Sequence, residues 1–217
     1  MSIISPSVTP TSDSVEEYRQ QLDRVSSFAH RIQIDLMDGQ FAKPKVIDVA
    51  DIWWPHDIEA DIHLMYQQPT DYIDTLISLR PSLVIIHAEA DGDLQVMMSR
   101  LQEVGIRVGV ALLQETSVDF ARSLIAQADH ALLFSGHLGS FGGVADLGLL
   151  EKVTEIRLIK PSIEIGWDGG ANTSNVSQLS SGGVDVINVG GSIQNAQEPK
   201  AMFDELTNRL SSAGALL

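Results

Sequence analysis

Short runs of aliphatic residues recur along the chain, and segments with helical spacing separate them. The run 31–37 alternates apolar and polar positions with a period of two, which is typical of a strand. The segment 15–25 instead places Val15, Tyr18, Leu22 and Val25 on one face of a helix. Just before it, Ser14 and Glu17 form a capping-box pattern, the usual start of a helix. The two patterns alternate along the chain and predict successive β-α units.

The expected strands are rich in Ile, Val and Leu, as parallel strands covered on both faces should be. They span residues 3–8, 31–37, 59–65, 82–88, 107–113, 130–135, 162–167 and 185–189. Helices are expected from residue 14 and near 46–54, 70–79, 93–104, 118–127, 147–158, 173–180 and 199–211. Eight such units predict an α/β protein, a (β/α)8 TIM barrel that forms a single domain over residues 1–217. An open doubly wound sheet is the alternative arrangement.

Composition excludes several classes of function. The net charge of -15 argues against a nucleic-acid surface, which needs a basic footprint. The chain has no cysteine, so neither disulfides nor thiolate ligands are available. No apolar run approaches the roughly 20 residues of a membrane span, and the first residues lack the pattern of a signal peptide. We therefore expect a cytoplasmic protein without nucleic-acid or membrane partners. A small anionic ligand remains compatible, since backbone amides bind phosphate without any lysine.

Polar residues interrupt the apolar runs near the ends of the expected strands. In a (β/α)8 barrel the C-terminal ends of the strands carry the chemistry. The residues at such ends are Asp35, Asp38, His63, His87, Glu89 and Asp168. We interpret His87 and Glu89 as mainly structural.

Asp35 lies inside a strand, where an unpaired carboxylate costs several kcal/mol. A salt bridge would explain the burial of Asp35, and a hydrogen bond to the backbone would explain a neutral His63 in the core. Asp35 and His63 nevertheless fall on adjacent strands, and Asp168 ends a distant one. Three such groups at one mouth would bind a divalent cation. Two carboxylates would also act on opposite sides of a substrate carbon.

Glycines fill the loops after the last three strands. They form Phe141-Gly-Gly143, Gly169-Gly170 and Gly190-Gly-Ser192. Glycine permits positive φ, so each pair is explained by a turn alone. In these barrels, however, the loops after strands seven and eight commonly hold a phosphate group. The backbone amides of Gly170, Gly191 and Ser192 would then face the anion.

The motifs at these strand ends resemble those of the ribulose-phosphate 3-epimerase family. The resemblance rests on Ile4-Ser-Pro-Ser-Val8, Ile34-Asp-Leu-Met-Asp-Gly39, Ile62-His-Leu-Met65, Phe141-Gly-Gly143, Trp167-Asp-Gly-Gly170 and Gly191-Ser192, in order along nearly the whole chain. It implies a (β/α)8 barrel that converts D-ribulose 5-phosphate to D-xylulose 5-phosphate by inverting C3 of the sugar. A metal-stabilised enediolate lies between the two sugars in that family.

The resemblance also implies roles for individual residues. Asp35 and Asp168 would transfer protons from opposite faces, and both would bind a divalent metal (Zn, Fe, Mn or Co) together with His63. Met37 and Met65 would shield the enediolate from water. The remaining contacts to substrate and phosphate would come from Ser7, Gly142, Gly143, Gly169, Gly170, Gly191 and Ser192. Family members are often dimeric or larger, so a homo-oligomer is also an implied state.

Three positions depart from the family pattern. Gln33 replaces a histidine that is a metal ligand in the family, Pro10 replaces a serine, and Leu138-Gly-Ser140 replaces Asn-Pro-Gly. An amide oxygen suits a harder cation better than zinc. His137 is a remote candidate for the missing ligand. The alternatives are proton transfer without metal, a related hexulose-phosphate epimerase, and a phosphosugar-binding relative with little or no turnover. A non-enzymatic scaffold is another. Met37, at the position of a decarboxylase lysine, argues against that class of barrel.

Overall fold

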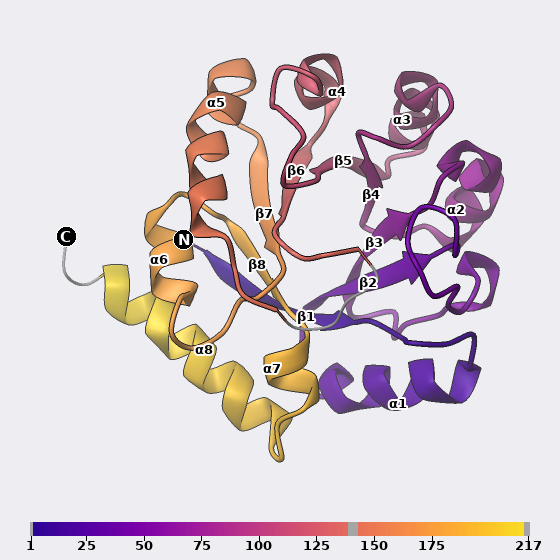
Figure 1. Cartoon of the computed structure of the whole chain (residues 1–217). Helices are drawn as coiled ribbons and strands as arrows, with labels where there is room; N and C mark the ends of the chain where they lie inside the picture. Colours follow the sequence, from indigo (N-terminus) through magenta and orange to yellow (C-terminus); the bar gives the residue numbers. More distant parts are fainter. Residues whose placement is uncertain (1, 139–142, 215–217) are drawn as a thin grey trace.

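The strands predicted from the period-two pattern form a ring of parallel strands with helices packed around it (Figure 1). The structure is a computed structural model and describes residues 2–138 and 143–214. Each strand pairs with the next in sequence, and β8 pairs with β1 to close the barrel. The predicted fold class, a (β/α)8 TIM barrel, is confirmed, and the open sheet is excluded.

The strands lie close to their expected positions. They are β1 Ile3–Val8, β2 Arg31–Met37, β3 Glu59–Met65, β4 Leu83–His87, β5 Arg107–Leu112, β6 His130–Phe134, β7 Glu164–Asp168 and β8 Val186–Val189. The α-helices are α1 Val15–Ser26, α2 Ile73–Leu79, α3 Leu94–Glu103, α4 Arg122–Gln127, α5 Glu151–Ile159, α6 Val176–Ser181, α7 Gly191–Gln194 and α8 Pro199–Gly214. Single 3-10 turns form at η1 Val49–Asp51, η2 Pro69–Tyr72 and η3 Leu147–Leu150.

Two helix predictions differ from the structure. The segment 46–54 holds only the turn η1, because the Val46 amide instead donates to the Met37 carbonyl and ties the segment to β2. The short helix α7 was not expected, since four residues are too few to show a helical period. The start of α1 follows the capping pattern in part. Ser14 accepts from the Glu17 amide, but the Glu17 carboxylate bonds Thr11 and Ser12 rather than Ser14.

Side chains alternate between the two faces of each strand. On β2, Ile32, Ile34 and Leu36 pack outward in the core shared with the helices, while Gln33 and Asp35 point inward. The interior itself is divided. Its apolar part comes from β4, β5 and β6 and consists of Leu83, Ile85, Ala111 and Leu132. Its polar part comes mainly from β7, β8, β1, β2 and β3 and contains Asp168, Asn188, Ser5, Ser7, Gln33, Asp35, Asp61 and His63. His87 of β4 and His130 of β6 add one buried imidazole each on the other side.

A second polar cluster lies at the N-terminal ends of the strands. Arg31 bonds Asp61 at 2.7 Å and both oxygens of Glu164 at 2.9 Å, and His130 Nδ1 lies 2.8 Å from Glu164. Buried polar residues of the strands thus lie at both ends of the barrel, and only those at the C-terminal ends were singled out from the sequence. This cluster closes the end of the barrel opposite the mouth. Removing one partner from a buried ion pair costs about 3–5 kcal/mol, so the cluster contributes to stability as a unit.

Of the helices in the described ranges, none combines the length and the apolar character needed to cross a membrane.

Candidate active site at the C-terminal mouth of the barrel

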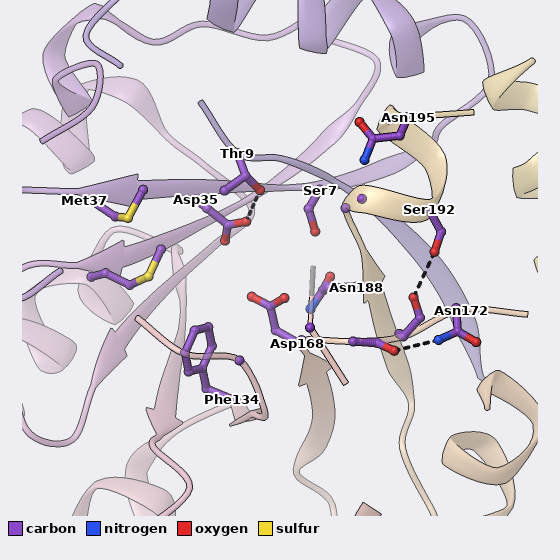
Figure 2. Close-up of a pocket in the computed structure, with 18 residues that line it drawn as sticks. Ser7, Thr9, Asp35, Met37, Phe134, Asp168, Asn172, Asn188, Ser192 and Asn195 are labelled. Carbon is purple, nitrogen blue, oxygen red and sulfur yellow. Dashed lines mark hydrogen bonds between the residues drawn. The ribbon is translucent and has the colours of Figure 1, made fainter. Parts of the chain in front are cut away.

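A cavity of about 350 Å³ opens at the C-terminal ends of the strands, where barrel enzymes carry their chemistry (Figure 2). It lies inside the ring because β1, β2, β3, β7 and β8 end in side chains that point toward the centre. The cavity is lined by Ser7, Thr9, Asp35, Met37, Met65, Phe134, Gly136, Gly143, Asp168, Gly169, Gly170, Ala171, Asn172, Asn188, Gly190, Gly191, Ser192 and Asn195.

Asp35 and Asp168 face this cavity from non-adjacent strands, and the amide of Gln33 joins them. Gln33 Nε2 donates to Asp35 Oδ1 at 2.8 Å and to Asp168 Oδ2 at 2.7 Å. His63 Nδ1 lies 2.9 Å from Asp35 Oδ1 and 3.5 Å from Asp168 Oδ2. Gln33 and His63 are fully buried behind the acids. Two carboxylates are thus held at one point by an amide and an imidazole.

The local electrostatics push the acid and the imidazole toward their protonated forms. Burial, followed by the nearby charge of Asp35, raises the pKa of Asp168, although bonds from His63 and Gln33 oppose this. For His63, burial alone would lower the pKa, but bonds to Asp168 and Asp35 and their charges raise it to about 9. At neutral pH the His63 imidazolium balances one carboxylate charge. A proton on His63 therefore offsets part of the negative charge of the two carboxylates, as a bound cation would do more fully.

His63 is held from behind by a second buried histidine. His63 Nε2 and His87 Nε2 lie 2.9 Å apart, and His87 Nδ1 lies 3.4 Å from a Glu89 oxygen. Burial lowers the pKa of His87 to about 4, in spite of Glu89, so His87 is the neutral partner. The neutral ring accepts the Nε2 proton of His63. The other nitrogen of His63, Nδ1, is thereby left directed at the two carboxylates.

Thr9 fixes the remaining oxygen of Asp35. Its hydroxyl donates to Asp35 Oδ2 at 2.5 Å from the segment that follows β1. Asp35 therefore receives a bond on each oxygen, which sets the rotation of its carboxylate plane. Pro10, which cannot donate, follows directly, so the threonine supplies a hydroxyl beside that position.

The residues fit a divalent cation. Asp35, His63 and Asp168 each offer a ligand atom, and these atoms lie within 4.8 Å of one another. Two carboxylates and an imidazole form a ligand set that first-row divalent metals bind. Gln33 adds a further indication, because its side-chain oxygen is buried and finds no hydrogen-bond partner among the described residues. Turning this amide by half a rotation would direct that oxygen at the carboxylate pair and supply a fourth ligand. His137 is exposed and is not part of this grouping.

The glycines after β7 are required by close approach of another loop. A Cβ on Gly170 would lie 2.2 Å from the Ala145 amide nitrogen, and one on Gly169 would lie 2.3 Å from that of Gly136. Both glycines also have positive φ, at 110° for Gly169 and 69° for Gly170. The loop after β6 therefore packs directly on the loop after β7, and the backbone itself forms this wall of the cavity.

Side chains turn the carbonyls of this loop away from the cavity. Asn172 donates to the Gly170 carbonyl at 3.0 Å, and Ser192 donates to the Ala171 carbonyl at 3.3 Å (Figure 2). Asn175 also donates to the Gly170 carbonyl at 3.0 Å. In a planar trans peptide the N–H points opposite to the C=O. The Ala171 N–H thus points away from the bonded Gly170 carbonyl, whereas the Asn172 N–H donates to Asn175 Oδ1 at 2.9 Å. The first amides of α7, at Gly191 and Ser192, have no partner within the helix.

The predicted site residues fall into three groups. The structure brings Ser7, Asp35, Met37, Met65, Gly143, Asp168, Gly169, Gly170, Gly191 and Ser192 to the cavity wall. His63 and Gln33 lie directly behind the acids, and Gly142 lies outside the described residues. Sequence reasoning missed Thr9, Phe134, Asn172, Asn188 and Asn195, which also line the cavity. Asn188 alone gave a usable signal, as a polar residue inside an apolar strand.

Comparisons with known proteins show the family to which the chain is related. The chain matches the model of the "Ribulose-phosphate 3 epimerase family" over residues 3–194. The ribulose-phosphate 3-epimerase of Helicobacter pylori is 29% identical over 199 residues, which cover 87% of this chain and 90% of the relative. That of Schizosaccharomyces pombe is 29% identical over 188 residues, covering 84% and 82%.

Solved structures show the same barrel at lower sequence identity. A 3-hexulose-6-phosphate synthase has a TM-score of 0.74 and 18% identity, with 96% of this chain and 99% of that chain covered. KGPDC from Streptococcus mutans has a TM-score of 0.70 and 10% identity, with 99% of both chains covered. At these identities the likeness shows a shared fold.

Proposed function

The chain belongs to the ribulose-phosphate 3-epimerase family, a family of isomerases, and on this premise we propose that it inverts C3 of D-ribulose 5-phosphate to give D-xylulose 5-phosphate. The observation that carries the proposal is the acid pair. Asp35 and Asp168 reach one cavity from β2 and β7, and the donors that join them are buried behind, away from the cavity. Inversion needs an acid and a base on opposite sides of one carbon, and this arrangement supplies both.

One aspartate would remove the proton of C3, and the other would return a proton to the opposite face of that carbon. One carboxylate removes the C3 proton, and the electron pair of the C–H bond moves into the enediolate formed with the C2 carbonyl. The other acid then donates a proton to the opposite face of C3. The raised pKa of Asp168 suits it to hold that proton, while Asp35 keeps a fixed carboxylate plane through Thr9 and Gln33. The return reaction exchanges the two roles.

Asp35, His63 and Asp168 would hold a divalent metal, with Gln33 as a weaker fourth ligand. What such a cation supplies when bound is Lewis-acid stabilisation of negative charge on substrate oxygen. Among Zn, Fe, Mn and Co, we propose that the amide of Gln33 favours a harder cation such as Mn or Fe over Zn, because amide oxygen is a harder donor than imidazole nitrogen.

The other walls of the cavity suit a sugar phosphate. Met37, Met65 and Phe134 line the cavity with apolar side chains, which would exclude water from the reacting carbons. Figure 2 shows Met37 beside Asp35 and Phe134 beside Asp168. Gly170, Gly191 and Ser192 line another part of the cavity. We propose that their backbone amides bind the phosphate and that Gly143 contributes from the loop after β6. Gly142, predicted for the same role, lies outside the described residues. The homo-oligomeric state stays a prediction.

Two alternatives remain distinct from this proposal. A hexulose-phosphate epimerase would use the same acid pair, with a longer sugar. A phosphosugar-binding relative would use the cradle without turnover. The retained pair of acids favours an enzyme, since a binding protein has no need to hold two carboxylates together at a cost in electrostatic repulsion.

Hydrogen–deuterium exchange tests the proposal directly. Metal content of the purified protein is measured first, and exchange at C3 of ribulose 5-phosphate in D2O is then followed by NMR. Asp35→Asn keeps the shape but removes the base, so exchange should be lost. Asp23→Asn, the same change on the exposed face of α1, is the matched control and should exchange normally. Undiminished exchange in Asp35→Asn would refute the mechanism, and binding without exchange in the wild-type protein would favour the binding relative.

A further inference from the structure

Asn188 is a buried amide in the short strand β8, whose other residues are Val186, Ile187 and Val189. Its side chain lines the cavity, only 2% of the residue is exposed, and its Oδ1 finds no hydrogen-bond partner in the part of the chain that the structure describes. A buried polar atom without a partner costs free energy, and such an atom is rare in native proteins. A hydrophobic residue would suit this strand better, so the amide indicates a group that arrives with the substrate.

Ser7 on β1 is likewise a buried polar residue without a hydrogen-bond partner among the described residues. It lines the cavity and is 1% exposed. Asn188 pairs in register with Asp168 of β7, so the two side chains point to the same side of the sheet. Ser7 lies on the other neighbour of β8, and a Cβ on Gly190 would lie only 3.5 Å from its own Cβ. The two unpartnered groups therefore border one sector of the cavity.

This sector lies between the acids and the proposed phosphate cradle. In Figure 2, Ser7 and Asn188 lie between Asp35 and Asp168 on one side and Ser192 on the other. In a pentulose 5-phosphate the reacting carbon is C3 and the phosphate is on C5. A substrate that spans from the acids to the cradle thus places C4 and its hydroxyl in this sector.

We propose that Asn188, together with Ser7, binds the C4 hydroxyl and is a residue that determines which ketose phosphates the enzyme accepts. The inference rests on the proposed function. A hydroxyl donates one hydrogen bond and accepts others, so it satisfies both groups at once. With the Asn188 amide and the Ser7 hydroxyl turned toward the cavity, the substrate hydroxyl donates its proton to Asn188 Oδ1 and its oxygen accepts the proton of the Ser7 hydroxyl. A sugar without this hydroxyl would leave both groups buried and unpartnered, which is how polar sites reject such analogues.

The test compares two substrates in two variants. Exchange at C3 in D2O is measured with ribulose 5-phosphate and with its 4-deoxy analogue. Wild-type protein should prefer ribulose 5-phosphate by about 10- to 100-fold in kcat/KM. Asn188→Leu, of similar size, should lose most of this preference by slowing the natural substrate, while its melting temperature stays equal or rises. Asn188→Val, which suits a strand, is the second variant if the first does not fold.

Ser5 supplies the matched control. It pairs in register with Asn188, is buried, and has an unpartnered hydroxyl among the described residues, but it does not line the cavity. Ser5→Ala should therefore keep the full preference for the hydroxylated substrate. An equal loss of rate on both substrates in both Asn188 variants would overturn the inference and leave the epimerase intact. Absence of exchange with either substrate in wild-type protein would overturn the proposed function and this inference together.

Discussion

Replacing Gln33 by methionine should destabilise the metal-free protein, because Gln33 donates to both carboxylates of the acid pair. The two bonds, of 2.8 and 2.7 Å, each end on a charged oxygen. Bonds to charged groups contribute about 1.5–3 kcal/mol each, so their loss costs about 3–6 kcal/mol. Methionine also removes the unpartnered amide oxygen of Gln33, which returns about 1–3 kcal/mol. The midpoints of these two ranges leave a net loss of about 2.5 kcal/mol, or roughly 5–10 °C in melting temperature for a domain of this size.

Metal should remove most of this difference. A cation held by Asp35, His63 and Asp168 places positive charge between the carboxylates, which then depend less on the amide donors. At a hundred times its dissociation constant, a ligand stabilises the folded state by about 2.7 kcal/mol. Chemical unfolding is therefore measured with a chelator and with saturating Mn²⁺. Gln33→Met should be clearly less stable than wild type in chelator and within about 1 kcal/mol of it in metal.

A matched variant separates the site from the chemistry of the substitution. Gln20→Met makes the same change on the exposed face of α1, where Gln20 donates to Glu16, and should shift stability by less than about 0.5 kcal/mol. Equal stability of Gln33→Met and wild type in chelator would refute the bridging role. An equal loss with and without metal would show that Gln33 also stabilises the metal-bound protein, as a strong fourth ligand would.

Three further predictions concern other parts of the molecule. Glu164→Gln should lower the free energy of unfolding by about 3–5 kcal/mol near neutral pH, measured by urea unfolding. Burial alone would raise the pKa of Glu164, but bonds from Arg31 and His130 hold it below its usual value, so the carboxylate stabilises the fold above a pH of about 4.3. The difference from wild type should therefore shrink as the pH falls below that value, and a constant difference would contradict the prediction. Gly170→Ala should weaken binding of inorganic phosphate in calorimetry much more than Gly105→Ala, since both glycines have positive φ but only Gly170 meets a neighbouring backbone; similar affinities would argue against a cradle. His87→Phe should weaken metal affinity about 10- to 100-fold in chelator competition, because His87 holds the proposed ligand His63. His56→Phe, the same change at an exposed position, should leave the affinity unchanged. Unaltered metal affinity in His87→Phe would exclude a positioning role.

The fold could be predicted because each strand is recognisable from its own residues, as a short run rich in Ile, Val and Leu. Ile32, Ile34 and Leu36 pack outward and Gln33 and Asp35 point inward, as the period-two pattern indicates. Asp35 and Asp168 were expected at one mouth because the C-terminal ends of all strands in a (β/α)8 barrel lie on the same face. Such inferences need only neighbouring residues and the topology.

Other features depend on partners that are distant in sequence. Arg31 and Glu164 are separated by 133 positions, so the charge cluster at the N-terminal end of the barrel has no local signature. The contact of Gln33 with both acids likewise appears only when β2 and β7 enclose one space. The resemblance showed that Gln33 departs from the family pattern, but its hydrogen bonds to Asp35 and Asp168 could be found only in the three-dimensional structure. Asn188 was passed over because one polar residue in a four-residue strand is weak evidence by itself.

The division of the barrel interior has a consequence for redesign of the chain. The side chains around the acid pair, Ser7, Asp35, His63, Asp168 and Asn188, come from β1, β2, β3, β7 and β8, which are contiguous around the ring but lie at the two ends of the sequence. The candidate site is therefore complete only when β8 pairs with β1, and a chain that ends before β7 lacks Asp168. Circular permutants that join the natural ends and open the chain between β4 and β6 would carry all five reactive strands on one uninterrupted stretch.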